Sequence, residues 1–521
     1  FSFVAGCWYL RFPHGVAPPR LRQGTNSSCQ ARIMASAEEL ALTPDDDAVD
    51  SALGNTQVEA PIASSNGVPQ RPGPTLLPAE KYRRVGVVRS RKDTGEYLDR
   101  KVPIELQEGL RESAQVSSVF VYPACQVSNP WLGFGGSFTE SSAVTLKRMS
   151  RAKREEVMCA YFGPPSGNQG LCYTMGRVPI GSCDFSLKSW SCGDTKDDPE
   201  LKGFTIARYR EAILPMLLRA SELSGKPLQM LASPWSPPTW MKTSGTFNRE
   251  GRVKSDCYAA WARHFVLFVQ EMEAAGIPIW AVSVQNEPEA SQRWESCQWS
   301  AEMERDFVAQ HLGPALEEAG LDVKIVIWDH NRDGMLERAA IAYSDPKASR
   351  YIWGVGYHWY GDGRFETWPE CCAVNFEERA TGSHVVELRA QAGFDNVRRV
   401  AELRPDKHIL FTESCQELDG VPLAKAQGDW KLGERYAMNI IADINSGTEG
   451  WIDWNLCLDE QGGPNHARNF CVAPIICDTR NDRVLYQPAY FYLGQFSRYI
   501  RPGARRVTCG TSRDVLEVTA W

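Results

Sequence analysis

Short runs of hydrophobic and β-branched residues recur along the middle of the chain, each followed by a polar loop and then by an amphipathic segment. Eight such runs lie between about residues 132 and 455: LGFGGSF, YTMGRVPI, LQMLASPW, IWAVSVQNE, KIVIWD, IWGVGYHWY, HILFTES and EGWIDWN. A strand that alternates with a helix is typical of a parallel sheet with crossover helices. Eight repeats predict an α/β fold in which the sheet closes into a (β/α)₈ TIM barrel.

One intervening segment shows helical periodicity clearly. Trp261, Phe265, Phe268 and Met272 are separated by four, three and four residues, so they share one face of a helix. We expect this face to pack against the barrel and the helix to end at Gly276. After the eighth run, the segment AYFYLGQFSRYI predicts the last helix of the repeat.

The two ends of the chain differ from this repeat. Residues 1–78 combine Pro, Gly, Ser and the acidic run Asp45–Asp47 with few periodic hydrophobic positions, which predicts a disordered leader. Residues 79–125 contain the alternating segments RVGVVRS and SSVFVYP, interpreted as strands of an accessory β-domain on either side of a charged loop. The barrel is expected over 126–500. Residues 501–521 begin a further β-segment, interpreted as the start of a truncated C-terminal part of that domain.

The first residues allow two interpretations. FSFVAGCWYL has the hydrophobic character of part of a secretory signal, which predicts a secreted protein or one of the lysosomal or endomembrane lumen. Alternatively, the protein begins at Met34 and the preceding segment is untranslated. The single Asn-x-Ser/Thr sequon, at Asn26, lies in that same segment and gives secretion weak support.

Composition narrows the function classes. Lys and Arg number 57 against 64 Asp and Glu, a net charge of −7 with mixed signs along the chain, which does not favour a nucleic-acid partner. No run reaches the roughly 18 apolar residues of a membrane span, so any membrane or lipid-surface contact is expected to be peripheral.

The cysteines and histidines do not form metal-ligand patterns. The sixteen cysteines lack CxxC pairs, and several, such as Cys183, Cys415 and Cys457, lie within hydrophobic runs, so we expect buried thiols. The eight histidines are dispersed, which predicts no metal site. The segment GFGG lacks the Lys-Ser/Thr of a phosphate-binding loop, and we expect no cofactor.

Polar residues that close a hydrophobic run are candidates for an active site, because barrel enzymes place their chemistry at the C-terminal ends of the strands. Asn286 and Glu287 close the fourth run, and Glu413 closes the seventh. Two carboxylates about 5 to 5.5 Å apart can cleave a glycoside with retention, one protonating the leaving oxygen while the other attacks the anomeric carbon. The alternative is that each glutamate is a surface or capping residue.

Aromatic residues follow several of the same runs. Trp235, Trp359, Tyr360 and Trp454 are expected at the same mouth, where such rings could stack on the apolar faces of a sugar. For any single ring, core packing is the alternative. The cluster beside two carboxylates favours a carbohydrate subsite.

Three further polar residues belong to this group. Asp184, after the second run, could accept hydrogen bonds from a sugar hydroxyl, and Arg177 could orient a carboxylate. Either could instead be a helix cap or part of a structural ion pair. His358 could donate to a substrate or to Glu413, and a satisfied wall residue is the alternative.

At these residues the sequence resembles the glucosylceramidases and related β-glucosidases of glycoside hydrolase family 30, over about residues 130 to 507. The segments GFGGSFTE, RVPIGSCDFS, LASPWSPPTW, VQNEPEA, GYHWY, FTESC, GWIDWNL, GGPNHARNF and APIICD occur in the family's order. The resemblance implies that Glu287 is the acid/base and Glu413 the nucleophile. It also implies a glucose subsite lined by Asp184, Trp235, Asn286, Trp454 and Asn469, with Arg177, His358 and Tyr360 supporting the nucleophile.

The resemblance implies the reaction more firmly than the substrate. The main hypothesis is hydrolysis of glucosylceramide to glucose and ceramide. NHARNFCVAPIICD also looks like microbial members of the family, some of which cleave β-1,6-glucan, so a β-1,6-glucanase or broad β-glucosidase is the alternative. The segment between Tyr360 and His408, with its Cys371–Cys372 pair, looks longer than in the animal enzyme. A non-catalytic carbohydrate-binding protein would be expected to lose at least one carboxylate.

Overall fold

The computed structural model describes residues 75–76, 84–106, 117–164, 170–360, 393–418, 420–513 and 516–521. Nearly all of the expected leader, with Asn26 and Met34, lies outside these residues, as does the Cys371–Cys372 pair. Within the described ranges, no helix has the length and apolarity needed to cross a membrane.

Eight parallel strands close into a barrel, as the eight hydrophobic runs predicted. Following the chain, each strand pairs with the next, and the last returns to pair with the first. The strands are β5 (Gly133–Ser137), β6 (Met175–Ile180), β7 (Gln229–Pro234), β8 (Ile279–Ser283), β9 (Lys324–Asn331), β10 (Ile352–His358), β11 (His408–Glu413) and β13 (Gly450–Asn455).

The interior of the barrel is filled by side chains, with one buried residue from each of six strands. This layer consists of Met175, Leu231, Ala281, Val326, Leu410 and Ile452. The other two strands bring their backbones close to a neighbour instead. A Cβ at Gly135 in β5 would lie 2.3 Å from the carbonyl oxygen of Met175, and one at Gly354 in β10 would lie 2.2 Å from that of His408. Glycine is required at such contacts because any side chain would clash.

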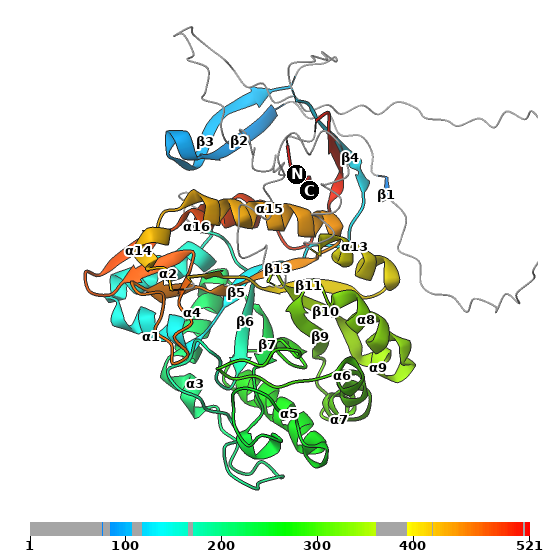
Figure 1. Cartoon of the computed structure of the whole chain (residues 1–521). Coiled ribbons are helices and arrows are strands. Elements are labelled where there is room, and N and C mark those ends of the chain that lie inside the picture. The colour runs from blue at the N-terminus through cyan, green and yellow to red at the C-terminus, as the bar shows by residue number, and fades with distance from the viewer. Residues whose placement is uncertain are drawn as a thin grey trace, which may run out of the picture.

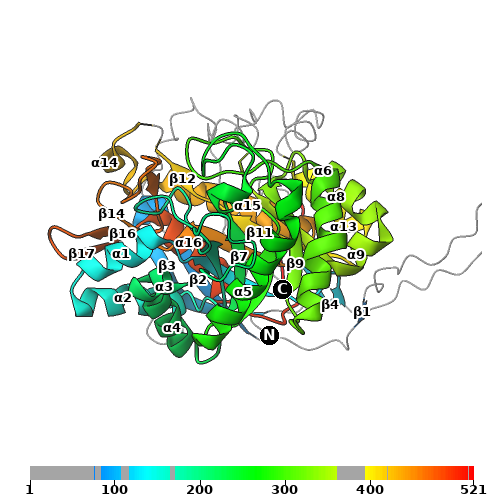
Figure 2. The ribbon, with the colours of Figure 1, turned by 90° about the horizontal axis from the view of Figure 1, so that it is seen from below.

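Helices stand around the strands (Figure 2). The predicted periodic segment forms α5 (Tyr258–Ala274), in which Trp261, Phe265, Phe268 and Met272 are all buried. The final segment forms α16 (Pro488–Ser497). The other helices are α1 (Glu140–Arg148), α2 (Arg151–Phe162), α3 (Ala207–Glu211), α4 (Ile213–Ser224), α6 (Ala301–Phe307), α7 (Gly313–Glu318), α8 (Met335–Ser344), α9 (Pro346–Tyr351), α13 (Phe394–Leu403), α14 (Leu423–Ala426) and α15 (Trp430–Ser446).

Segments from both ends of the chain form two small sheets beside α15 and α16, away from the barrel strands (Figure 1). One is the antiparallel hairpin of β2 (Arg84–Arg91) and β3 (Glu96–Glu105). Part of the expected charged loop, Glu96–Glu105, is therefore a strand. In the other sheet, β4 (Val119–Gln126) pairs with both β1 (Thr75–Leu76) and β18 (Val507–Thr511).

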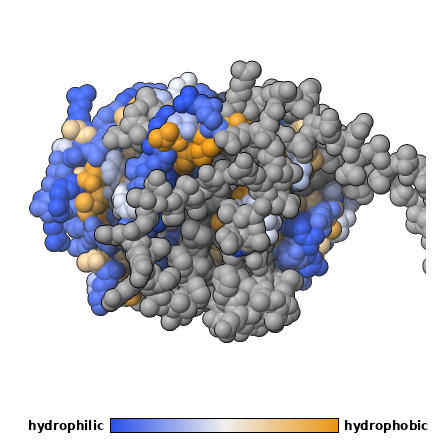
Figure 3. Space-filling view, turned by 90° about the horizontal axis from the view of Figure 1, so that it is seen from above, coloured by the Kyte–Doolittle hydropathy of each residue, from blue (hydrophilic) through white to orange (hydrophobic). Residues whose placement is uncertain are grey.

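Where Figure 3 shows described residues on this face, they are mainly hydrophilic, with small hydrophobic areas between them. Two further small sheets extend the region after the last barrel strand. One contains β14 (Cys457–Asp459), β16 (Ile475–Asp478) and β17 (Arg483–Tyr486), and the other pairs β12 (Gln416–Glu417) with β15 (Cys471–Val472). They bring the segment that follows β13 beside the segment that follows β11.

Candidate active site

The two predicted carboxylates meet at the C-terminal mouth of the barrel. Glu413 is the last residue of β11, and Glu287 lies four residues beyond the end of β8. Their carboxylate oxygens and a ring nitrogen of His358 lie within 4.8 Å of one another. Both side chains are largely buried, with exposed fractions of 15% for Glu287 and 8% for Glu413. The mouth therefore contains an acidic pair with little access to bulk water.

Arg177 connects this pair to the strands beneath it. Its Nη1 donates to Glu413 Oε2 at 2.5 Å, and its Nη2 donates to Asp329 Oδ2 at 2.8 Å and to Asn286 Oδ1 at 2.7 Å. Because the Asn286 oxygen accepts from the guanidinium, the amide NH₂ group of Asn286 is left to donate to a bound molecule. Tyr360 also contacts Glu413, with its hydroxyl 3.3 Å from Oε1.

His358 contacts Glu287 rather than Glu413. Its Nδ1 lies 3.2 Å from Glu287 Oε1, and its Nε2 lies 3.0 Å from Asp329 Oδ1. With a carboxylate at each nitrogen, the ring satisfies both contacts by carrying two protons. Burial lowers the pKa of His358, but the charge of Glu413 and the bonds to Asp329 and Glu287 outweigh it and raise this pKa to about 9.

The pKa values of the two glutamates are shifted in opposite directions. Burial opposes ionisation of Glu287, but the hydrogen bond from His358 and the positive charges around it bring the net pKa below its ordinary value. Burial raises the pKa of Glu413, and the charge of Glu287 adds to this effect. The hydrogen bond from His358 therefore favours the ionised form of Glu287, whereas burial favours the protonated form of Glu413.

Asp329, in β9, is a central residue of the site that sequence reasoning missed. It is fully buried and accepts from Ser233 Oγ at 3.0 Å, Ser283 Oγ at 2.5 Å and Thr412 Oγ1 at 2.6 Å, in addition to Arg177 and His358. Burial opposes its ionisation, yet the charge of Arg177 and these hydrogen bonds hold its pKa far below the usual range. The run KIVIWD carried the signal, because this aspartate also closes a hydrophobic run.

The backbone at Glu287 is in the left-handed region, with φ of 49°. Such a conformation costs an ordinary residue roughly 1–2 kcal/mol, so surrounding contacts must hold it. The Glu287 N–H donates to the carbonyl oxygen of Asp329 at 2.9 Å, and the Asn286 N–H donates to that of Pro234 at 2.9 Å. These bonds across neighbouring strands fix the direction in which the Glu287 side chain leaves the chain.

The remaining predicted residues form one wall of the mouth. Trp235 and Trp454 are stacked with their ring centroids 5.1 Å apart, and the Arg177 guanidinium lies over both rings. Asn469 Nδ2 donates to Asp184 Oδ2 at 3.1 Å. Burial and the charge of Glu413 raise the pKa of Asp184 well above its usual value. All ten predicted site residues thus belong to this mouth.

The prediction for Trp359 was wrong. This residue is fully buried outside the barrel wall, 4.7 Å from the ring of Tyr436 and beneath the Arg435 guanidinium at 4.1 Å. His358 already faces the barrel axis, so the next residue of an extended chain points to the opposite side. Trp359 is a core residue.

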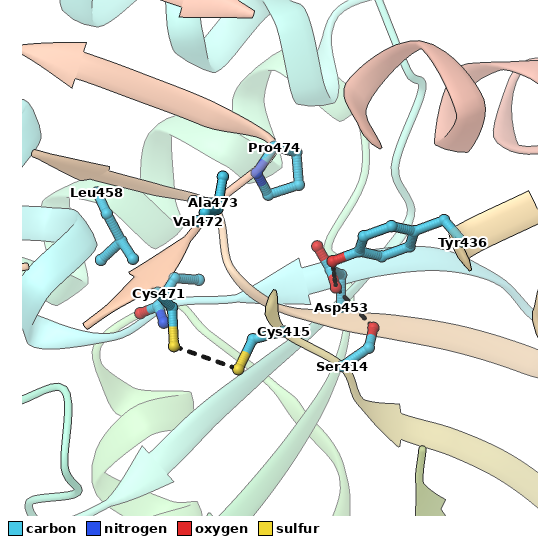
Figure 4. Close-up of a pocket in the computed structure, with 10 residues that line it drawn as sticks. Ser414, Cys415, Tyr436, Asp453, Leu458, Cys471, Val472, Ala473 and Pro474 are labelled. Atoms are coloured by element: carbon cyan, nitrogen blue, oxygen red, sulfur yellow. Dashed lines mark hydrogen bonds between the residues drawn. The ribbon is translucent and has the colours of Figure 1, made fainter. Parts of the chain in front are cut away.

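The two residues that follow Glu413 in the chain, Ser414 and Cys415, belong to a group of polar and sulfur-containing side chains (Figure 4). Ser414 Oγ and the Tyr436 hydroxyl both donate to Asp453 Oδ1, at 2.6 and 2.8 Å. Burial raises the pKa of Asp453 to about 7. Cys415 and Cys471 are free thiols with sulfur atoms 3.4 Å apart. The space between these groups is too small to admit a water molecule.

One group of described residues has donor atoms close enough together to share a metal ion, and it is Glu287, His358 and Glu413 themselves. A cation there would face the Arg177 guanidinium, which already lies 2.5 Å from Glu413. The donor set therefore fits a proton-transfer pair better than a metal centre.

The chain is similar to known proteins over most of its length. The chain matches the glycosyl hydrolase family 30 TIM-barrel domain over residues 132–375 and 381–500. It is 34% identical to the putative glucosylceramidase 3 of Caenorhabditis elegans over 417 residues, 78% of this chain and 74% of that protein. It is 31% identical to the lysosomal acid glucosylceramidase of Mus musculus over 398 residues, covering 74% and 72% of the two chains.

Two solved structures have the same fold. SrfJ from Salmonella typhimurium is 33% identical with a TM-score of 0.71, covering 84% of this chain and 88% of that one. The endo-β1,6-glucanase BT3312 is 25% identical with a TM-score of 0.67, covering 83% and 87%. With a closed barrel, two converging carboxylates and these relatives, the chain belongs to glycosyl hydrolase family 30 and is a glycoside hydrolase with glucosylceramidase homologues.

Proposed function

We propose that the protein is a retaining β-glucosidase that hydrolyses glucosylceramide to glucose and ceramide. The observation that carries the retaining mechanism is the spacing of Glu287 and Glu413, whose oxygens lie within 4.8 Å of one another, and the glucosylceramidase relatives support the substrate. Retaining glycosidases hold their carboxyl groups about 5 to 5.5 Å apart, whereas inverting enzymes need roughly 6.5 to 9.5 Å to fit a water molecule between substrate and base.

In the proposed reaction, Glu287 donates its proton to the glycosidic oxygen while Glu413 attacks the anomeric carbon. The bond to the leaving group breaks, ceramide departs as an alcohol, and glucose remains attached to Glu413 as an ester. Glu287, now ionised, removes a proton from water, and the resulting hydroxide displaces Glu413. Glucose leaves, and both carboxyl groups return to their initial states.

The reactive form of the pair carries a single proton on Glu287. Burial, which raises the pKa of Glu413, and His358, which lowers that of Glu287, both oppose this form. Arg177 supports the transfer to Glu287, since its contact at 2.5 Å stabilises the ionised nucleophile. We therefore propose an activity that falls at low pH, where the pair gains a second proton, and at high pH, where it loses its last one.

The proposed glucose subsite is the wall beside this pair. Asp184 and Asn469 would receive sugar hydroxyls, and the free NH₂ group of Asn286 would donate to the 2-hydroxyl, where bonding strengthens in the transition state. The stacked Trp235 and Trp454 supply the apolar contact. Both carboxylates are retained, which argues against a binding protein without catalysis.

A β-1,6-glucanase is the second candidate, supported by the likeness to the endo-β1,6-glucanase BT3312. A side-by-side assay separates the two. The full chain would be incubated with glucosylceramide, with and without detergent or anionic lipid, and with β-1,6-glucan. Release of glucose and ceramide supports the first proposal, whereas activity on the glucan alone would require the second.

We also propose that the protein acts in the secreted or endomembrane-lumen space, which the lysosomal mouse relative supports, and that it contacts glycolipid peripherally. The two small sheets from both chain ends are proposed as its accessory β-domain. Fractionation of cells that express the complete natural protein, with lysosomal and cytosolic markers, would test the location.

A further inference from the structure

A charged carboxylate is buried next to the proposed glucose subsite and takes no part in the proposed chemistry. Glu295 lies in the segment that follows Glu287, and its side chain is 1% exposed. Its Oε1 accepts from Ser182 Oγ at 2.7 Å, and its Oε2 lies 3.3 Å from His466 Nε2. A buried ionised group is retained at low cost only where it is paired and hydrogen-bonded.

His466 is held at both of its ring nitrogens. Nε2 faces Glu295, and Nδ1 lies 2.9 Å from the carbonyl oxygen of Ser186. A neutral imidazole has one N–H, so it cannot donate to both acceptors at once. Nε2 also lies 3.5 Å from Ser189 Oγ. The doubly protonated ring can donate from Nδ1 to Ser186 while its Nε2–H faces the Glu295 carboxylate, and the interaction with Glu295 raises the pKa of His466 above the ordinary value.

These contacts join three loops that are far apart in the sequence. Ser182 and Ser186 flank Asp184 in the loop after β6, Glu295 lies in the loop after β8, and His466 lies in the loop after β13. Asn469, three residues beyond His466, donates to Asp184 at 3.1 Å. The charged pair thus clamps the two loops that carry the Asp184–Asn469 contact.

We propose that Glu295 and His466 are positioning residues, which hold Asp184 and Asn469 where they can bind the glucose ring. Protonation of His466 then controls substrate affinity. This inference rests on the proposed function of that subsite. When His466 loses a proton, one of its nitrogens presents a lone pair to the Ser186 carbonyl or the Glu295 carboxylate. Repulsion then separates the loops and displaces Asn469 from Asp184.

The charges that face the pair support this direction. His466 faces Glu295 and lies within the field of Asp184, both of which favour its protonated form. Glu295 faces His466 and lies within the field of Lys242, which also favours ionisation of the carboxyl. Arg293 and Arg468 lie on the same two loops, where Arg293 Nη2 donates to the Arg468 carbonyl oxygen at 3.4 Å.

The test compares His466→Gln with wild type on 4-nitrophenyl β-glucoside, measuring kcat and KM separately at pH 5.5 and 8.5. We expect KM to rise about tenfold at pH 5.5, the effect of losing one hydrogen bond to a charged group, with kcat changed less than threefold. Wild-type KM should rise between pH 5.5 and 8.5, and the variant's KM should not. Unchanged KM in the variant at pH 5.5 would overturn the proposal.

His408→Gln is the matched control, because His408 Nδ1 lies 2.6 Å from Glu449 Oε2 at the opposite end of the barrel. Its KM should equal that of wild type. NMR titration of His466 provides a readout without activity: the pKa should lie above 6.5 in wild type and fall in Glu295→Gln. A wild-type enzyme inactive on every β-glucoside defeats the proposed function. In that case, an ordinary pKa of His466 would also refute the positioning role of Glu295 and His466. A raised pKa would still support that role.

Discussion

The imidazole of His358 lies 3.2 Å from the carboxylate of Glu287, so the proposed general acid is in contact with a positive charge. This contact favours the ionised form of Glu287, whereas catalysis requires its protonated form. The pH above which activity is lost should therefore depend on the pKa of Glu287, which the contact with His358 lowers.

Replacing His358 with Gln should move the whole pH profile to higher pH. Removal of the imidazolium raises the pKa values of both glutamates, because its charge lowers each of them in the wild type. Loss of the last proton from the pair, which sets the alkaline limb, then occurs at higher pH, and so does the second protonation that sets the acidic limb. The measurement is kcat/KM against pH, and a shift to lower pH would contradict the assignment.

Azide should distinguish the roles of Glu413 and Glu287 by stereochemistry. In Glu413→Ala, azide can enter the space of the lost carboxylate and attack the β-glucoside directly, which yields the α-glucosyl azide. In Glu287→Ala, the ester on Glu413 still forms from an activated substrate, and azide attacks it from the opposite face to yield the β-glucosyl azide.

Rates provide a second readout for this pair. The loss in Glu287→Ala should be about 10²- to 10⁴-fold with a poor leaving group and much smaller with 4-nitrophenol, because a good leaving group needs no acid. NMR of the products and the rates on both substrates check the assignment. If the two variants gave the reverse pattern of azides, the roles would have to be exchanged.

Asp329→Asn should cost both activity and stability. The amide keeps the size of the side chain but removes the charge that pairs with both Arg177 and His358, so each of these buried cations loses one of its two carboxylate partners. Breaking a buried ion pair costs roughly 3–5 kcal/mol. Asp406→Asn is the control, since the Asp406–Arg404 pair is partly exposed and about 1 kcal/mol or less is expected. Denaturant titration measures the free energy of unfolding of both variants. Equal losses of this free energy would refute the central place of Asp329.

His264 should make the protein less stable in acid. It is 1% exposed, packs on Trp261 and Phe204, and burial lowers its pKa to about 3. Because the unfolded chain binds this proton near pH 6.5, stability is complete above pH 6.5 and is lost as pH falls toward 3, by up to about 1.4 kcal/mol per pH unit.

His264→Phe should reduce this dependence, because the phenyl ring cannot take a proton and suits the aromatic surroundings. The free energy of unfolding of both proteins would be measured between pH 7 and 4. Parallel curves for the variant and the wild type would show that another group causes the acid sensitivity.

The sequence by itself determined the barrel and the positions of its chemistry. Eight runs separated by helices leave closure as the architecture that satisfies every strand, and strand ends then select Glu287 and Glu413. The same criterion would have found Asp329, which closes the run KIVIWD. Strict alternation would also have placed Trp359 in the core, since His358 takes the inward position.

The tertiary structure alone decided which partners these residues have. Which of the two glutamates is protonated depends on distances across the barrel. His358 contacts Glu287, whereas Arg177 contacts Glu413. Neither pairing has a sequence spacing that could reveal it. The contact of Glu295 with His466 likewise joins two loops whose path no local pattern specifies. Periodicity is a property of neighbouring residues, whereas a pKa is set by every charge nearby in space, and folding brings those charges together.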